Sequence, residues 1–261
     1  MKETLNDLDG KTWLKYSISI WSIEKTHQEM KLEHPAVFPL ELCKRLIEIF
    51  TKKGDTVLDP FVGSGTTMVA ARDLERHGIG FDVNPKFIEI AKKRVSQQKI
   101  IPLEIDDVRL YCEDARNILN FVKPNSVDLI ITSPPYWDVL WQKRTADGRD
   151  SRPYSSLEND IGNISDFDEF MNVLTEIFEK CYSVLKEGKN IVVIVKDIRK
   201  GSIFIPYHIK VIDIMEKIGF KLDDIIIWDR RQAYNNLVAL GYPYVFVVNT
   251  VHEYILLFEK S

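Results

Sequence analysis

The strongest candidates for catalytic residues are Ser133, Pro134, Pro135 and Tyr136, which directly follow the apolar run Val127–Thr132. Such a run is typical of a buried parallel strand, whereas two consecutive prolines make a poor helix start. The prolines fix the backbone and remove N–H donors, so a hydroxyl and a carbonyl that accept hydrogen bonds stand beside an aromatic face. The alternative is a rigid strand exit whose aromatic side chains belong to the core.

A second candidate is the segment Asp59-Pro-Phe-Val-Gly-Ser-Gly-Thr-Thr, called the glycine loop below, which joins a predicted strand to a predicted helix. Gly63 and Gly65 let a ligand approach the backbone, and the helix start beyond them offers free N–H groups. The loop lacks the lysine of a P-loop and the third glycine of a dinucleotide fingerprint. Taken alone, it could be a purely structural turn.

Two acidic residues, Asp82 and Asp114, follow the next two predicted strands. At such a position a carboxylate can accept both hydroxyls of a ribose or the amino group of an adenine. The alternative for each is a helix N-cap, and Asp114 is well placed to be one. Both acids after one glycine loop favour a nucleoside site.

The elements that must position these residues alternate between β-branched runs and amphipathic segments, which is typical of an α/β fold with helices on both faces of a mostly parallel sheet. Seven strands are predicted, over residues 56–59, 80–83, 108–112, 127–132, 190–195, 221–228 and 253–258. Five helices are predicted between them, over residues 39–52, 66–77, 85–98, 166–185 and 207–218.

Composition is ordinary for a globular protein, with 45% apolar and 28% charged residues in 261. Without an apolar run long enough for a membrane or a signal core, we expect a soluble, cytoplasmic protein. The three cysteines, Cys43, Cys112 and Cys181, lie far apart in apolar stretches, which favours reduced core thiols and no metal site.

Basic residues cluster after three predicted strands, although the net charge is −4. The clusters comprise Lys143, Arg144, Arg149 and Arg152, then Arg199 and Lys200, then Arg230 and Arg231. Each could be a solvated loop, but their common placement favours one rim of the sheet.

Three segments together resemble the DNA amino-methyltransferases, which use S-adenosylmethionine to methylate exocyclic amines of cytosine or adenine. They are the glycine loop, Ser133-Pro-Pro-Tyr-Trp and His252-Glu-Tyr-Ile-Leu-Leu-Phe-Glu-Lys. The upstream His34-Pro-Ala-Val-Phe-Pro-Leu-Glu-Leu looks like the segment that this family places before its glycine loop. The resemblance implies a Rossmann-like methyltransferase fold with a seven-stranded sheet and a final antiparallel strand.

The same resemblance assigns roles within one domain over residues 1–261, with a cofactor-binding half at 33–125 and a catalytic half at 126–261. The implied cofactor-binding residues are Phe38, Pro39, Asp59, Pro60, Phe61, Gly63, Ser64, Gly65, Thr66, Asp82 and Asp114. The implied catalytic floor is Ser133, Pro134, Pro135 and Tyr136. His252 and Glu253 are interpreted as scaffolding.

An exocyclic amine is a poor nucleophile because its lone pair is delocalised, so acceptors at Ser133 and Pro134 would help by binding its hydrogens. Tyr136 would stack on a flipped base. No cysteine lies near this motif, which argues against C5 methylation of cytosine. The Ser-Pro-Pro-Tyr form favours N4-cytosine, with N6-adenine as the nearest alternative and a non-catalytic DNA-binding subunit as a more distant one.

The order of the two halves is the reverse of many Ser-Pro-Pro-Tyr enzymes, which also carry a target-recognition domain. Double-stranded DNA would then contact loops 138–165, 199–206 and 229–249, where basic residues and aromatics such as Trp137 alternate. A second copy or a separate specificity subunit could supply recognition instead, and a cognate restriction endonuclease is a further possible partner.

Overall fold

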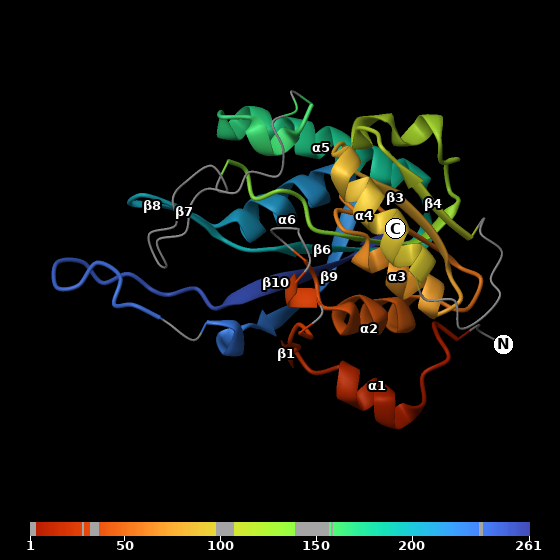
Figure 1. Ribbon diagram of the computed structural model, residues 1–261, viewed down its shortest axis with the longest axis horizontal. Helices are drawn as coiled ribbons and strands as arrows, with labels where there is room; N and C mark the ends of the chain where they lie inside the picture. Colours follow the sequence, from red (N-terminus) through yellow and green to blue (C-terminus); the bar gives the residue numbers. More distant parts are fainter. Residues whose placement is uncertain are drawn as a thin grey trace.

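The computed structural model describes residues 4–27, 29–31, 37–97, 107–138, 157, 159–234 and 237–261. At its centre lies an eight-stranded sheet in the order β1-β9-β10-β6-β5-β2-β3-β4 (Figure 1). Its strands are β1 (Ile20–Ser22), β2 (Thr56–Asp59), β3 (His77–Phe81), β4 (Val108–Tyr111), β5 (Val127–Thr132), β6 (Leu185–Val195), β9 (Phe220–Asp229) and β10 (His252–Lys260). A separate hairpin joins β7 (Ile198–Lys200) to β8 (Ile203–Ile205).

The predicted α/β class is confirmed, because β10 runs antiparallel between β6 and β9 while the other neighbouring strands of the large sheet are parallel. The prediction of seven strands was wrong. The eighth, β1, pairs in parallel with β9 at the edge of the sheet. A three-residue strand is too short to show a period of two in the sequence, so only its tertiary pairing reveals it.

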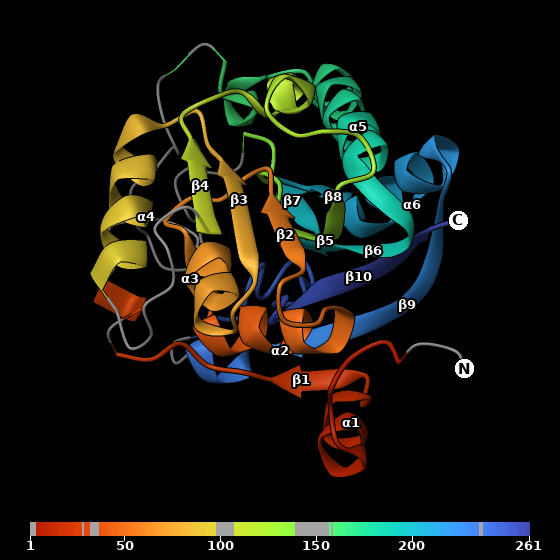
Figure 2. The same cartoon turned by 90° about the vertical axis from the view of Figure 1, so that its right-hand side faces the viewer.

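Helices cover both faces of the sheet (Figure 2). One side carries α2 (Leu40–Phe50), α3 (Thr66–Asp73) and α4 (Pro85–Gln97), and the other carries α5 (Phe167–Val184) and α6 (Tyr207–Ile218). These are the five predicted helices. A further helix, α1 (Gly10–Tyr16), was not predicted and lies against α2.

The amphipathic pattern of α5 explains the packing of its face of the sheet. Its apolar residues recur at intervals of three and four and pack into the larger apolar cluster, where Phe170, Leu174 and Phe178 are fully buried. Asp166 caps the helix by accepting from the Glu169 N–H at 2.8 Å. The helix therefore begins directly after Asp166, whose carboxylate accepts from a backbone N–H of the first turn that has no partner within the helix.

The strand order reverses between β2 and β5, because β3 and β4 follow on one side of β2 while β6 lies on the other side of β5. Parallel α/β sheets bind ligands in the crevice at such a reversal, at the carboxyl ends of the strands. This edge carries the glycine loop and the segment that begins at Ser133.

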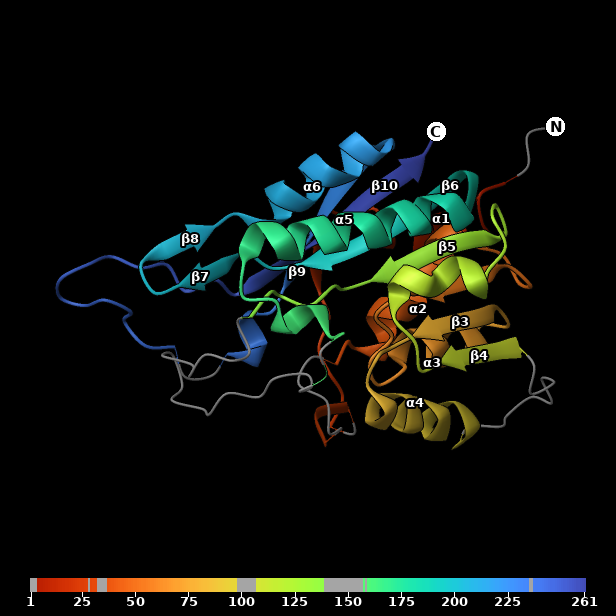
Figure 3. The same ribbon diagram turned by 90° about the horizontal axis from the view of Figure 1, so that it is seen from above.

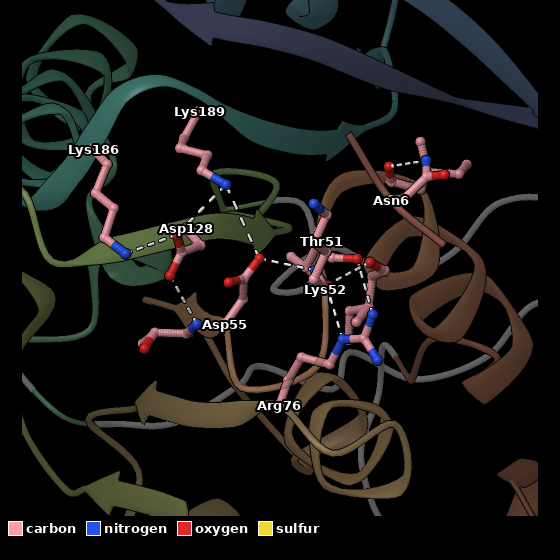
Figure 4. Close-up of polar contacts among 11 residues, drawn as sticks. Asn6, Thr51, Lys52, Asp55, Arg76, Asp128, Lys186 and Lys189 are labelled. Atoms are coloured by element: carbon pink, nitrogen blue, oxygen red, sulfur yellow. Dashed lines mark hydrogen bonds and ion pairs between the residues drawn. The ribbon is translucent and has the colours of Figure 1, made fainter. Parts of the chain in front are cut away.

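A polar cluster holds the opposite, amino-terminal edge of the same two strands (Figure 4). Asp128 on β5 accepts from the Thr56 N–H of β2 at 3.0 Å and from Lys186 Nζ at 2.8 Å. Lys189 lies 3.5 Å from Asp128 and 4.0 Å from Asp55. These contacts fix β2 and β5 side by side, far from the ligand crevice.

The thiols follow the prediction only in part. All three are free, and Cys43 and Cys181 are buried, but Cys112 is exposed. Cys112 directly follows β4, at the edge of the sheet, so the apolar stretch around it does not bury it. In the described ranges, no helix combines the length and apolarity needed to cross a membrane.

Candidate active site

A pocket opens at the reversal point of the sheet. Its lining includes ten of the residues identified in the sequence: Phe38, Asp59, Pro60, Phe61, Ser64, Thr66, Asp82, Asp114, Ser133 and Pro135. Segments far apart in the chain thus form the wall of one cavity.

Asp59 anchors the glycine loop where β2 ends. Its carboxylate accepts from Thr67 Oγ1 at 2.7 Å, from Thr132 Oγ1 at 3.1 Å and from the Phe61 N–H at 3.0 Å. Burial raises the pKa of this carboxyl to about 6. Because these protein groups occupy both oxygens, Asp59 shapes the pocket wall and joins it to β5.

The two glycines of the loop have distinct roles. Gly65 has φ of +82° and immediately precedes α3, and a Cβ there would lie 2.7 Å from the Cβ of Ala91. Gly63 has φ of +50° and donates its N–H to Asp82 at 3.0 Å. Both positions use a conformation that favours glycine, and Gly65 also permits close packing of α3 on α4.

Asp82 lies on the pocket wall just beyond β3. Besides Gly63, the Asn84 N–H donates to it at 2.8 Å. Burial raises the pKa of Asp82 to about 7, with the nearby Asp160 and Asp59 adding to the effect. Two backbone donors orient the carboxylate, and its remaining lone pairs can accept hydrogen bonds from a ligand.

The carboxylate of Asp114 lies both at a helix N-terminus and in the pocket lining. It caps the short helix η3 (Ala115–Asn120) by accepting from the Arg116 N–H at 2.8 Å, and it pairs with the Arg116 guanidinium at 2.6 Å. It also lines the pocket. The cap and the ion pair fix the orientation of this carboxylate in the pocket wall.

Arg94, which packs behind the glycine loop, was not predicted as a site residue. Its Nη1 donates to the Ser64 carbonyl at 2.7 Å and to Thr66 Oγ1 at 3.0 Å. Burial lowers the pKa of Arg94. The signal was its position on α4, three residues after the buried Ala91 and therefore on the same face of the helix.

Glu29 was also missed, although Thr26-x-x-Glu29 has the spacing of a capping box. The Thr26 N–H donates to Glu29 Oε2 at 2.6 Å, and the Leu40 N–H at the start of α2 donates to Oε1 at 2.6 Å. This clamp fixes the start of α2 next to Phe38, which lines the pocket and whose ring packs edge-on against Trp228. Pro39 precedes α2 directly and is not part of the lining.

The Ser-Pro-Pro-Tyr segment leaves β5 along the pocket wall. Ser133 and Pro135 line the cavity, and Tyr207 at the start of α6 donates its hydroxyl to the Pro135 carbonyl at 3.5 Å. Tyr136 is half-buried, and its hydroxyl lies 3.2 Å from Glu253 Oε2. The backbone of the segment is thereby supported from α6 and its aromatic ring from β10.

Loop 138–165 was predicted to face DNA, but its described end serves the pocket. Asn159, Asp160 and Ile161 belong to the lining. Ile161 is buried against α5, so this end of the loop contributes to the wall of the cavity.

Two of the predicted DNA contacts are corrected by the structure. Trp137 is only 8% exposed and packs edge-on against Phe167, because the backbone turn with φ of +50° directs the indole into the core. Arg230 points inward and pairs with the buried Glu253, which needs a compensating charge.

The remaining basic residues have mixed placements. Lys200 pairs with Asp138 at 2.6 Å, Arg199 lies over the Phe204 ring, and Arg231 is exposed although it pairs with Asp229. Lys143, Arg144, Arg149 and Arg152 lie outside the described residues.

Two projections leave the sheet at its carboxyl edge, on the left in Figure 3. One is the β7–β8 hairpin, and the other is residues 237–248, here called the apolar arm. The arm contains no charged side chain, and Tyr242, Tyr244 and Phe246 are 80%, 90% and 93% exposed. The loop 229–249 is therefore basic only at its root and apolar at its tip.

The pocket fits a nucleoside-containing ligand with a carboxylate. Asp82 and Asp114 offer acceptors for hydroxyl and amino groups, and Thr66 begins a helix whose free N–H groups favour a negative charge. Phe38 and Phe87 add apolar surface. Among the described residues, no group of three or more His, Cys, Asp or Glu could hold a metal ion.

Comparison with known proteins shows a matching sequence family and a matching fold. The type II methyltransferase M.BglI of Bacillus subtilis is 45% identical over 91 residues, which is 34% of this chain and 26% of that protein. The type II methyltransferase M.HindIII of Haemophilus influenzae is 38% identical over 99 residues, which is 33% of this chain and 32% of that protein. The matched stretches span about a quarter to a third of these relatives.

Solved structures support the fold. A SAM-dependent methyltransferase from Methanosarcina mazei superposes with a TM-score of 0.53 at 11% identity, covering 82% of this chain and 96% of that one. An rRNA methylase from Streptococcus thermophilus gives 0.50 at 14% identity, covering 86% and 98%. The sheet order, the glycine loop and these likenesses identify a Rossmann-like methyltransferase fold. A family model described as DNA methylase (N6_N4_Mtase) matches residues 2–93 and 127–261, and this chain belongs to that family.

Proposed function

We propose that this protein transfers a methyl group from S-adenosylmethionine to the exocyclic N4 amine of a flipped cytosine in double-stranded DNA. The observation that carries the proposal is that Ser133 and Pro135 line the same pocket as Asp82 and Asp114. The Ser133 hydroxyl, an acceptor suited to an amine, and the carboxylates of Asp82 and Asp114, which are suited to a nucleoside, thus face one cavity. We also propose that residues 1–261 act as a single domain with a cofactor half and a catalytic half.

In this proposal the cofactor occupies the crevice at β2, β3 and β4. Asp82 accepts the ribose hydroxyls, Asp114 accepts the adenine amine, and the start of α3 at Thr66 faces the carboxylate. Phe38 closes over the ligand from the clamp made by Glu29. When bound, the cofactor supplies a methyl group made electrophilic by its sulfonium.

The catalytic floor prepares the amine. Ser133 Oγ and the Pro134 carbonyl accept its hydrogens, which localises the nitrogen lone pair, and Tyr136 offers a face on which the base stacks. Because no covalent nucleophile is needed, most of the acceleration comes from position and orientation.

We propose that DNA lies across the carboxyl edge of the sheet, between the β7–β8 hairpin and the apolar arm. The arm has no charge with which to bind phosphates, so its exposed rings are suited to stacking on bases or wedging between them. Arg199 and Arg231 stand near the bases of the two projections and are suited to phosphate contacts. Lys143, Arg144, Arg149 and Arg152 remain predicted contacts.

N6-adenine methylation is the second candidate, because Ser133 can accept from either amine and the matched family model covers both N6 and N4 enzymes. The Ser-Pro-Pro-Tyr form supports cytosine. Target recognition is assigned to the same edge, with a second copy or a specificity subunit as the alternative source. The type II relatives make a cognate restriction endonuclease a possible partner.

The test is to incubate the protein and S-adenosylmethionine with unmodified genomic DNA from several sources, digest the DNA to nucleosides and separate the products by chromatography and mass spectrometry. We expect N4-methylcytosine, which chromatography distinguishes from its C5 isomer, and a much lower yield of it from the matched Ser133→Ala protein in the same assay. N6-methyladenine would overturn the cytosine assignment alone. No methylated base and no cofactor binding would overturn the enzyme assignment.

A further inference from the structure

A chain of polar contacts leads away from the catalytic floor into the sheet. Ser133 Oγ lies 3.5 Å from the Tyr136 hydroxyl, which lies 3.2 Å from Glu253 Oε2. The other oxygen of Glu253 pairs with Arg230 Nη1. Glu253 is only 3% exposed, so its charge needs this guanidinium. This series of polar contacts connects the segment after β5 to β10 and to the residue that follows β9.

The chemistry of these groups fixes the direction of each hydrogen bond. An ionised carboxylate can only accept, so the Tyr136 hydroxyl must donate to Glu253. The Tyr136 oxygen then has lone pairs but no hydrogen left, so Ser133 donates its own hydrogen to it. The consequence is that Ser133 Oγ turns only lone pairs toward the pocket.

We propose that Glu253 and Arg230 are positioning residues that hold Ser133 as a hydrogen-bond acceptor through Tyr136. The inference rests on the proposed function, because an acceptor at Ser133 matters only if a donor such as an amine N–H enters the pocket. A serine with a freely rotating hydrogen could present that hydrogen to the amine and would then repel the N–H it must bind. Tyr136 therefore has two roles, one through its ring and one through its hydroxyl.

The first test is Tyr136→Phe, which keeps the ring and leaves the Glu253–Arg230 pair intact. We expect the single-turnover methylation rate to fall about 10- to 100-fold, while DNA affinity changes by less than about threefold. Glu253→Gln should give a similar loss, because its amide can donate to the Tyr136 oxygen and reverse the chain. Tyr182→Phe is the matched control, since Tyr182 packs against Phe220 at the far end of β9, and its rate should equal the parent's.

The second test separates this role from a general structural one. In a Ser133→Ala background there is no hydroxyl to orient, so Tyr136→Phe or Glu253→Gln should lower the remaining rate by less than about twofold. Calorimetry of cofactor binding confirms that each variant is folded. If Glu253→Gln fails to fold, Tyr136→Phe still decides the question.

If the parent is active and the Tyr136→Phe variant methylates at a rate within about twofold of the parent's, the inference is overturned but the proposed function is not. The inference would also be overturned if Tyr136→Phe and Glu253→Gln lowered the rate as much in the Ser133→Ala background as in the parent. A parent that neither binds the cofactor nor methylates any duplex would overturn both, because an oriented acceptor then has no amine to bind.

Discussion

Asp82→Asn is expected to make the protein more stable and its cofactor site weaker. The carboxylate stands on the pocket wall, where burial raises its pKa from 3.8 to about 7. A group placed for binding is often held in an environment that disfavours its charge. Removing the charge should therefore separate stability from function.

The magnitude follows from the pKa. One pKa unit corresponds to about 1.4 kcal/mol, so the ionised carboxylate costs about 4 kcal/mol of folding free energy above pH 7. Asparagine removes this cost, but it has only one acceptor oxygen for the Gly63 and Asn84 N–H groups. Losing one of these hydrogen bonds costs about 1–3 kcal/mol. At pH 8 we expect a net increase in unfolding free energy of about 1–3 kcal/mol.

The sign depends on pH. Because the folded pKa of Asp82 lies above the unfolded value, the native state binds more protons between pH 3.8 and about 7. The parent therefore loses stability from this group as pH rises through that window. At pH 5 most Asp82 is already protonated, so the variant should show little gain or a small loss.

Urea unfolding at pH 5 and pH 8 measures the stability difference, and titration calorimetry at pH 8 should show cofactor affinity about 10- to 100-fold weaker in the variant. Asp223→Asn, at an exposed position on β9, is the control and should alter neither quantity. A variant less stable than the parent at pH 8, or a stability difference equal at both pH values, would refute the reasoning.

Three other predictions test separate parts of the structure. Gly65→Ala should lower the unfolding free energy by about 2–4 kcal/mol, because its φ is +82° and the new Cβ would lie 2.7 Å from that of Ala91; thermal unfolding with and without cofactor checks this. Asp128→Asn should lower it by about 1–3 kcal/mol and leave cofactor affinity unchanged, since Asp128 lies at the opposite edge of the sheet. Replacing Tyr244 and Phe246 by Ser should weaken DNA binding about 10-fold or more with an unchanged salt slope, whereas a slope that flattens would contradict base contact by the arm.

Local patterns in the sequence determined most of the elements and the segments of the site. β2 and β5 have the predicted bounds, and α6 begins and ends where its apolar spacing indicated. Asp82 and Asp114 lie in one pocket because the carboxyl ends of parallel strands meet at one edge of a sheet. Such features depend on periodicity and on strand direction, which neighbouring residues specify.

Tertiary structure alone decided which side chains face the ligand and which face the core. Trp137 and Arg230 look like surface residues in the sequence, yet one is packed against Phe167 and the other pairs with Glu253. Arg94 becomes part of the site because α4 packs beside the glycine loop. In each case the partner is distant in the chain, and the free-energy costs of burying a large ring or an unpaired charge are settled only when the elements pack together.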